Sequence, residues 1–541
     1  MNDKYADQRQ MQHRLFSMLS DMFGDEVPLY DKSLLVNSVC NHTVCDLLSQ
    51  IHIGFNLTSE QIEKTSGERH GAIRIGKPSE YRWISRLFAV FAMEPHNYYD
   101  MTAVGDKSQP IVATAFRSRL NPDHRVFSSL LMTDYFDPDT KARIEDLIAT
   151  RDVFSESAKE LIIKNERQGG LEWDDADALI DECIHHIFKW TGQARDYQLY
   201  TDLCDAGFKI AADIACFGSH HLNHLTPNTF CIDLYTAAMK FCMGELDEVR
   251  FCSQAKNTLN VLAQTADRDY LQLHFKDLSA EDIDAFETKS VTEEKVQQLL
   301  NKLTERLQQT DLDLDRLNHA GFKDHTEGPA AGTPILLRQD AYKALSEPVQ
   351  FLNADGTTVN SVHTARFGEI EQRFYATTPK GRKLYDRCLS QVDSIKNIAA
   401  SNSYAQKYAQ FFESFPKRLE ELLKQELVYG RYSVTEKGVA AKGQVTTTDI
   451  NELVRLGYVS VEGLRYEDFL PVSAAGIFAS NLSQYGTQST AAEKPNYSQS
   501  MLEHILDRKI VDANETYARL QAESLITVYS QLGLDHKPAI S

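Results

Sequence analysis

The alternation of apolar and polar positions changes character several times along the chain. Residues 8–65 carry apolar side chains at helical spacing, which predicts an N-terminal helical segment over residues 1–65. From Gly67 the pattern becomes that of strands: HGAIRIG, then a helical stretch, PSEYRWISRLFAVFAME, then the strand-like runs NYYDMTA, PIVATAFRS and HRVFSSLLMT. Residues 66–136 are therefore expected to form a first module of order β-α-β-β-β.

A second mixed region follows a helical segment at residues 137–212. Over residues 213–375, HHLNHLTPNT predicts a strand and turn, IDLYTAAMKFCM a helix, and PILLRQ, PVQFLNA and VHTARFGEIEQRFYA three strands. This second β-α-β-β-β pattern is split by a charged, amphipathic helical insertion at about 243–318, which is most simply interpreted as a solvated flap. Residues 376–541 are expected to be mostly helical, with short strands around GRYSVTEKG and LVRLGYVSVEGL.

The doubled pattern predicts an α+β fold in which two βαβββ modules form a curved mixed sheet around a metal cleft. Helical N-terminal, middle and C-terminal segments would surround it. The chain has 541 residues, of which 42% are hydrophobic, so its core needs no disulfide or metal to be stable.

The net charge and the cysteines limit which partners the protein can bind and indicate its cellular compartment. The net charge of −20 opposes nucleic-acid binding, although a local arginine can still bind a small anion. The nine cysteines include no CxxC pair, which indicates reduced thiols. No apolar run approaches the ~18 residues that span a bilayer. With the polar N-terminus, these features predict a cytoplasmic protein without a membrane partner.

The strand expected in GERHGAIRIG carries a histidine and an arginine on the same face. Side chains alternate along a strand, so His70, Ala72 and Arg74 point one way and the intervening isoleucine the other. Four steps of ~3.3 Å put His70 and Arg74 about 13 Å apart, and Ala72 leaves room between them for a small molecule with an anionic end. The structural alternative is an edge histidine and an arginine paired with Glu68 or another acid.

Three histidines lie close together in GSHHLNHLTP. His220 and His224 would share a face if this run is extended, and His221 would point away. Imidazole is the commonest metal ligand near neutral pH, so the cluster favours a metal site. A polar turn with surface histidines is the alternative.

A third polar face is expected in HTARFGEIEQR. Two carboxylates on one strand face need partners, and Glu371 with Arg373 would make an ordinary pair on a solvated face. A bulge at Gly368 would interrupt the periodicity. The positions that would share this face are His363, Ala365, Phe367, Glu369, Glu371 and Arg373.

Together these pieces supply two histidines and a carboxylate from separate strands. Three such ligands on one side of a metal suit non-haem Fe(II), which must also bind substrate and O2. Zinc with two histidines and one glutamate, as in hydrolases, is the rival. The sequence has no HExxH helix, GxSxG elbow, Gly-rich phosphate loop or Rossmann fingerprint.

Several longer motifs add a family resemblance. The segments ERHGAIRIG, HRVFSSLL, NHLTP, PILLRQ, HTARFGEIEQR, TEKG and YEDFLPVSAAGIF resemble the 2-oxoadipate dioxygenase/decarboxylase family, also called 2-hydroxyglutarate synthase. This family is a branch of the vicinal oxygen chelate superfamily, whose modules are βαβββ. The resemblance covers most of the chain outside about 243–318.

The resemblance implies roles for individual residues. It makes His70, His224 and Glu369 the metal ligands, and so selects Glu369 over Glu371. It makes Arg74 the residue that holds a substrate carboxylate. The positions that match the family's substrate pocket are Gln339, Val472 and Ser473.

The resemblance also implies a reaction. A 2-oxo acid would bind Fe(II) through its carboxylate and keto oxygens, lose CO2 oxidatively and be hydroxylated, so that 2-oxoadipate and O2 give 2-hydroxyglutarate in lysine catabolism. Arg74 would clamp the distal carboxylate. The sequence departs from the family at Asn228, where a basic residue is expected, at Phe374, where glycine is expected, and in its long insertion.

Two rival functions use the same scaffold. One is a zinc-dependent hydrolase or glyoxalase-like isomerase, which would work without O2. The other is a non-enzymatic binding protein that docks a partner through the helical insertion.

Overall fold

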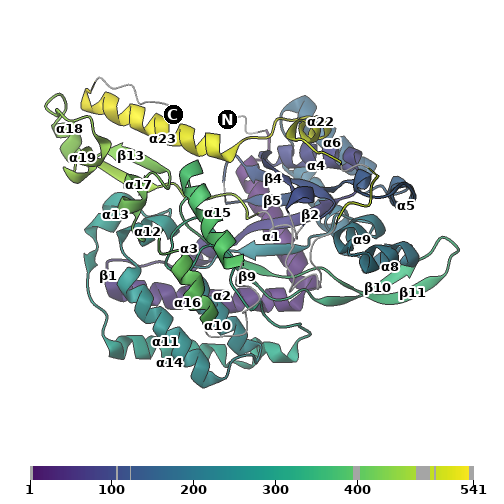
Figure 1. Cartoon of the computed structure of the whole chain (residues 1–541), viewed down its shortest axis with the longest axis horizontal. Coiled ribbons are helices and arrows are strands. Elements are labelled where there is room, and N and C mark those ends of the chain that lie inside the picture. Colours follow the sequence, from purple (N-terminus) through teal and green to yellow (C-terminus); the bar gives the residue numbers. More distant parts are fainter. Residues whose placement is uncertain are drawn as a thin grey trace.

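The computed structural model describes residues 4–104, 108–121, 123–393, 403–470, 488–492 and 495–534 (Figure 1). Its largest sheet has five strands in the order β3-β4-β5-β2-β7, with helices packed around it. Among the described residues, no helix is long and apolar enough to cross a membrane. The nine cysteines are all in the reduced, thiol form.

The first mixed region has its elements in the predicted order, and its strands form one sheet together with β7, which the sequence assigned to the second module. β2 lies between β5, to which it is parallel, and β7, to which it is antiparallel. The helix predicted to reach Glu94 ends instead at Val90, because Ala92 adopts a left-handed conformation (φ 53°) and turns the chain into β3. The elements are β2 (Glu68–Ile75), α4 (Pro78–Val90), β3 (Met93–Asp100), β4 (Ile111–Ser118), β5 (Arg125–Leu131) and β7 (His224–Pro227).

Two further strands from the second mixed region form a separate two-stranded sheet that lies beside β7. The backbone N–H of Thr229 donates to the carbonyl of Glu371 (2.9 Å), and that of Phe367 donates to the carbonyl of Asn223 (3.1 Å). These bonds hold β12 (Glu369–Arg373) beside β7, and β12 pairs antiparallel with β9 (Leu337–Ala341). The α10 helix (Ile232–Cys242) connects β7 to the segment before β9.

The rest of the second region differs from the predicted module. The single long strand expected over residues 362–376 is broken into β11 (Thr358–Thr364) and β12. The break lies at Gly368, where a Cβ atom would come within 2.3 Å of the Tyr342 ring, so the chain changes direction where only glycine fits. As a result β11 joins β10 (Ser346–Leu352) and β6 (Gln193–Arg195) in a separate three-stranded sheet. The β10–β11 hairpin projects from the body of the molecule (Figure 1).

The helical insertion belongs to the main core and is not the solvated flap that its charge suggested. Phe251, Leu259, Leu300 and Leu303 are buried in the same apolar cluster as the N-terminal helices. In Figure 1 its teal helices lie beside α2, and β8 (Glu287–Thr288) pairs with β1 (His52–Ile53). The N-terminal helices are α1 (Gln8–Glu26), α2 (Pro28–Ile51) and α3 (Ser59–Ser66). The helices of the insertion are α11 (Glu248–Thr265), α12 (Arg268–His274), α13 (Ala280–Ala285) and α14 (Glu293–Leu307).

The middle and C-terminal segments are mainly helical, as predicted. Strands β13 (Gly430–Val434) and β14 (Val459–Gly463) pair antiparallel at the two motifs expected to be short strands. The middle helices are α5 (Pro138–Ala149), α6 (Glu156–Gln168), α7 (Trp173–Glu182), α8 (Tyr197–Asp205) and α9 (Lys209–Cys216). The C-terminal helices are α15 (Pro379–Asp393), α16 (Ser403–Phe411), α17 (Leu419–Lys424), α18 (Glu436–Ala440), α19 (Ile450–Arg455), α22 (Gln499–Leu506) and α23 (Ala513–Leu532).

Candidate metal centre and substrate site

Three neighbouring strands place one polar side chain each in a row. In the β2–β7 register His70 is opposite Thr226, and Ala72 is opposite His224. A bridge between Asn228 and Glu371 fixes the parallel register of β7 and β12, which brings Glu369 level with Thr226. Because paired residues project from the same side of a sheet, His70, His224 and Glu369 all face one another.

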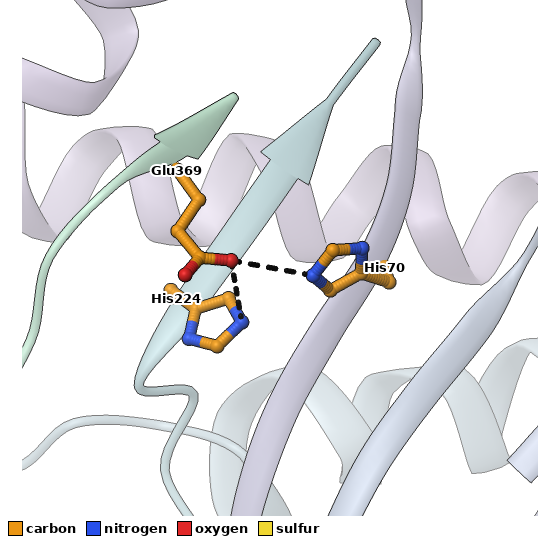
Figure 2. A group of neighbouring side chains, drawn as sticks. All are labelled: His70, His224 and Glu369. Carbon is orange, nitrogen blue, oxygen red and sulfur yellow. Dashed lines mark ion pairs between the residues drawn. The ribbon is translucent and has the colours of Figure 1, made fainter. Parts of the chain in front are cut away.

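The three side chains converge on one point (Figure 2). Nε2 of His70 and Nε2 of His224 each lie 3.4 Å from the same carboxylate oxygen of Glu369. One ligand atom from each residue lies within 4.8 Å of the others, and all three residues are buried. A buried group of two imidazoles and one carboxylate could hold a metal ion.

The polar atoms of this group are better placed to bind a cation than to form hydrogen bonds with one another. Distances of 3.4 Å are longer than normal N–H···O hydrogen bonds. Among the described residues, neither ring nitrogen of His224 has a hydrogen-bond partner. Burial lowers the pKa of His224 well below its usual value, and His70 and Arg74 lower it further, so the ring is neutral and able to donate a lone pair to a metal. Burial raises the pKa of Glu369, a cost that a bound cation would offset.

A second carboxylate supports His70 from the opposite ring nitrogen. Oε2 of Glu371 lies 3.1 Å from Nδ1 of His70. Arg373 donates two hydrogen bonds to Glu371 (2.5 and 2.8 Å), and Arg125 donates one (3.2 Å). Burial alone would raise the pKa of Glu371, but Arg373, His70 and Arg125 hold it well below the usual range. A carboxylate behind a ligating histidine fixes the ring and its tautomer.

Gln339 and Thr226 hold the Glu369 carboxylate. The Gln339 side-chain amide donates to Oε2 of Glu369 (2.7 Å), and the Thr226 hydroxyl donates to the same oxygen (3.2 Å). Gln339 therefore lies next to the candidate metal centre, where the sequence placed a pocket residue. Thr226 was not singled out from the sequence, although it lies between the two motif residues His224 and Asn228.

Arg74 lies on the same face of β2 as His70 and is buried. Its Nη1 donates to Oδ2 of Asp213 (2.6 Å), an acid of α9, so this arginine does have an acidic partner. The alternative of an edge histidine is wrong, because His70 is buried on a strand that has a neighbour on each side. The charge of Arg74 lowers the pKa of His224.

The other histidines of the two polar motifs are buried elsewhere. Nε2 of His220 lies 3.8 Å from Glu80, and Nε2 of His221 lies 3.3 Å from Asp213. The interpretation of this cluster as surface histidines is therefore wrong. His363 does not share a face with Glu369 as predicted, because the break at Gly368 carries it into the other sheet, where it contacts Asp213.

Four further residues were singled out from the sequence, two as pocket positions and two as departures from the family. Val472 and Ser473 lie outside the described residues. Asn228 is buried, and its carbonyl accepts a hydrogen bond from Asn37 of α2 (3.0 Å). Phe374 packs near His274, with ring centroids 6.0 Å apart, and belongs to the edge of the C-terminal apolar cluster.

Sequence reasoning missed two charged residues that support the site. Arg125 donates to the side chain of Glu467 (3.0 Å) as well as to Glu371. Both lie in motifs noted for family resemblance, HRVFSSLL and YEDFLPVSAAGIF, but their pairing joins distant segments and has no local signal. Phe469, two residues after Glu467, packs edge-on against His70, with centroids 4.7 Å apart.

Comparisons with known proteins agree with the geometry. The family model for 2-oxoadipate dioxygenase/decarboxylase matches residues 15–277 and 240–481. The Pseudomonas putida protein named 2-oxoadipate dioxygenase/decarboxylase is 33% identical to this chain, and the alignment covers 95% of each protein. The Escherichia coli protein of the same name is 29% identical, over 94% of this chain and 95% of that protein. The crystal structure of the Pseudomonas putida hydroxyglutarate synthase in complex with 2-oxoadipate aligns with a TM-score of 0.67 and 30% identity, over 98% of this chain and 100% of that chain. The chain therefore belongs to the 2-oxoadipate dioxygenase/decarboxylase family.

Proposed function

We propose that the protein is a cytoplasmic, Fe(II)-dependent enzyme that converts 2-oxoadipate and O2 into 2-hydroxyglutarate and CO2 in lysine catabolism. The observation that carries the proposal is the buried group of His70, His224 and Glu369 in a chain of this family. The names of its relatives support the dioxygenase/decarboxylase class and the substrate.

The ligand set supports iron. When bound by two histidines and one carboxylate, non-haem Fe(II) keeps positions for a substrate and O2 and supplies the oxidising chemistry. The protein's own contribution is a set of imidazoles and a carboxylate that other side chains already hold in place. Glu371 orients His70, and Gln339 and Thr226 orient Glu369, so little reorganisation is needed when the metal enters.

Arg74 would bind the distal carboxylate of the substrate. Its guanidinium lies on the same face as the ligands, and a planar guanidinium can bind a carboxylate through two parallel hydrogen bonds. This contact would fix the chain of the acid relative to the centre and so orient the carbon to be hydroxylated. Gln339, Val472 and Ser473 are proposed to line the same pocket.

Oxygen consumption tests the proposal. The metal is removed with a chelator, the protein is reloaded with Fe(II) without air, 2-oxoadipate is added and O2 is admitted. We expect O2 consumed, CO2 released and 2-hydroxyglutarate formed in equal amounts. The Zn(II)-loaded protein and the Glu369→Gln variant are the controls and should consume no O2.

Two outcomes would contradict the proposal. Turnover by the Zn(II)-loaded protein without O2 would favour the hydrolase or isomerase. No consumption of O2 with any 2-oxo acid, together with intact substrate binding, would favour a binding protein.

A further inference from the structure

A second buried polar cluster lies directly behind Arg74. Asp213 is at its centre: Oδ2 accepts from Arg74 (2.6 Å), while Oδ1 lies 3.0 Å from Nε2 of His363 and 3.3 Å from Nε2 of His221. All four residues are buried. One carboxylate thus joins the candidate substrate arginine to two imidazoles.

The surroundings of the two imidazoles are aromatic and can accept a positive charge. Trp190 stacks parallel to His363 at 6.0 Å and contacts His221 edge-on at 4.7 Å, and Phe217 lies 4.7 Å from His363. Ring faces attract cations, so an imidazolium here is stabilised by Asp213 and by the rings. The titratable and charged groups whose charges act on the cluster are Arg74, Tyr200, Cys204, Cys216, Asp213, His221 and His363.

The hydrogen bonds can be satisfied in either protonation state of His363. The Tyr200 hydroxyl lies 2.9 Å from Nδ1 of His363 and can donate to that nitrogen when it is bare or accept from it when it is protonated. Burial lowers the pKa of His363, which favours a neutral ring when no extra anion is near. A proton can therefore be added without leaving a buried group unpaired.

The local charges indicate when this proton is needed. The Arg74–Asp213 pair sums to zero. A distal carboxylate bound to Arg74 would add one negative charge to this buried cluster, whereas a monocarboxylic acid would add none there.

We propose that Asp213 is a positioning residue for Arg74, and that His363 takes up one proton from solvent when a distal carboxylate binds to Arg74. The cluster thereby makes the site selective for dicarboxylic over monocarboxylic 2-oxo acids. This inference rests on the proposed function, because it takes Arg74 as the distal-carboxylate site.

Calorimetry without air tests the proposal, since Fe(II)-loaded protein then binds substrate without turnover. Binding enthalpies of 2-oxoadipate and of 2-oxohexanoate, which has the same chain length but no distal carboxylate, are measured at pH 8 in buffers of different ionisation enthalpy. We expect 2-oxoadipate to take up about one proton more than 2-oxohexanoate. Equal proton uptake by the two acids would overturn the proposal.

Variants locate the proton. His363→Gln removes the imidazole but keeps an amide that can donate to Asp213, and it should abolish the difference between the two acids. His185→Gln is the matched control, because His185 is an exposed histidine away from the cluster, and it should leave the difference intact. A difference that survives in His363→Gln would also overturn the proposal.

Steady-state kinetics with the two acids distinguishes a positioning role of Asp213 from a purely structural one. Asp213→Asn should raise KM for 2-oxoadipate at least tenfold with little change in kcat, and should leave KM for 2-oxohexanoate near the wild-type value. Equal losses with both acids would show a structural role and refute the positioning role. If 2-oxoadipate does not bind at all, both the inference and the proposed function are overturned. If the O2 assay fails as well, the proposed function is the part that is wrong.

Discussion

Replacing Glu371 by glutamine tests whether a buried charge network orients the metal ligand His70. Glutamine keeps the shape of the side chain but removes the charge that faces His70, Arg125 and Arg373. After the change, Glu467 is the remaining carboxylate observed on Arg125, at 3.0 Å. The variant therefore weakens the support of His70 and leaves a buried positive charge uncompensated.

Two magnitudes follow from this geometry. Removing one partner of a buried ion pair costs about 3–5 kcal/mol of folding free energy, because the other charge stays buried. Loss of the partner behind a ligating histidine costs about 10–100-fold in metal affinity, or roughly 1.4–2.7 kcal/mol. Both effects should appear together, since the same carboxylate serves both purposes.

The assay measures metal affinity and stability separately. Affinity for Fe(II) or Co(II) is obtained by competition with a chelator under anaerobic conditions, and stability from urea unfolding of the metal-free protein. The control is Glu462→Gln, which removes an exposed carboxylate paired with Arg431 at 3.4 Å and should change both quantities little. Wild-type metal affinity in Glu371→Gln, despite a clear loss of stability, would refute the orienting role.

Three further predictions follow from the site. His224→Ala and Glu369→Gln should each lose metal by elemental analysis; a Glu369 variant that kept full metal content would identify another carboxylate as the ligand. Arg74→Ala should raise KM for 2-oxoadipate by an amount equivalent to roughly 2–5 kcal/mol while metal content stays near wild type, and unchanged substrate affinity would exclude the clamp. Although burial would raise the pKa of Glu467, Lys276 and nearby arginines lower it to about 2. Because the pKa of Glu467 is lower in the folded protein than in the unfolded chain (about 4.3), its charge stabilises the fold above that value, and this stabilisation is lost as the pH falls towards 2. In urea unfolding, Glu467→Gln should therefore lower the free energy of unfolding by about 3 kcal/mol at pH 6 and by much less at pH 3. Equal losses at the two pH values would contradict the lowered pKa of Glu467.

The sequence predicted the local parts of the site well. Strand alternation places His70 and Arg74 on one face, and the structure has both on the inner face of β2. Alternation could not choose between Glu369 and Glu371, because both lie on the same face of β12 and both approach His70. Family resemblance selected Glu369, and the structure shows Oε2 of Glu369 within 3.4 Å of both histidines.

The failures of sequence reasoning concern contacts between distant segments. His363 was expected beside Glu369, but a single close approach at Gly368 redirects the strand, and periodicity does not reveal such steric limits. The amphipathic pattern of the insertion predicted its helices, yet it could not show that the apolar stripe packs on the N-terminal helices. Asp213 gave no signal, because its role depends on how α9 packs against β2.

The strand register also sets the order in which the site residues lie along β2. Along β2, His70 lies level with Thr226 and Glu369, Ala72 lies level with His224, and Arg74 follows one step further. The candidate metal ligands therefore occupy one end of this face and the arginine the other. In the proposed function, a dicarboxylic 2-oxo acid held at the metal end would point its distal carboxylate towards Arg74 and away from the carboxylate of Glu369. Ala72 lies between His70 and Arg74 on this face, so a bulkier residue there should weaken binding of long acids before it weakens binding of metal.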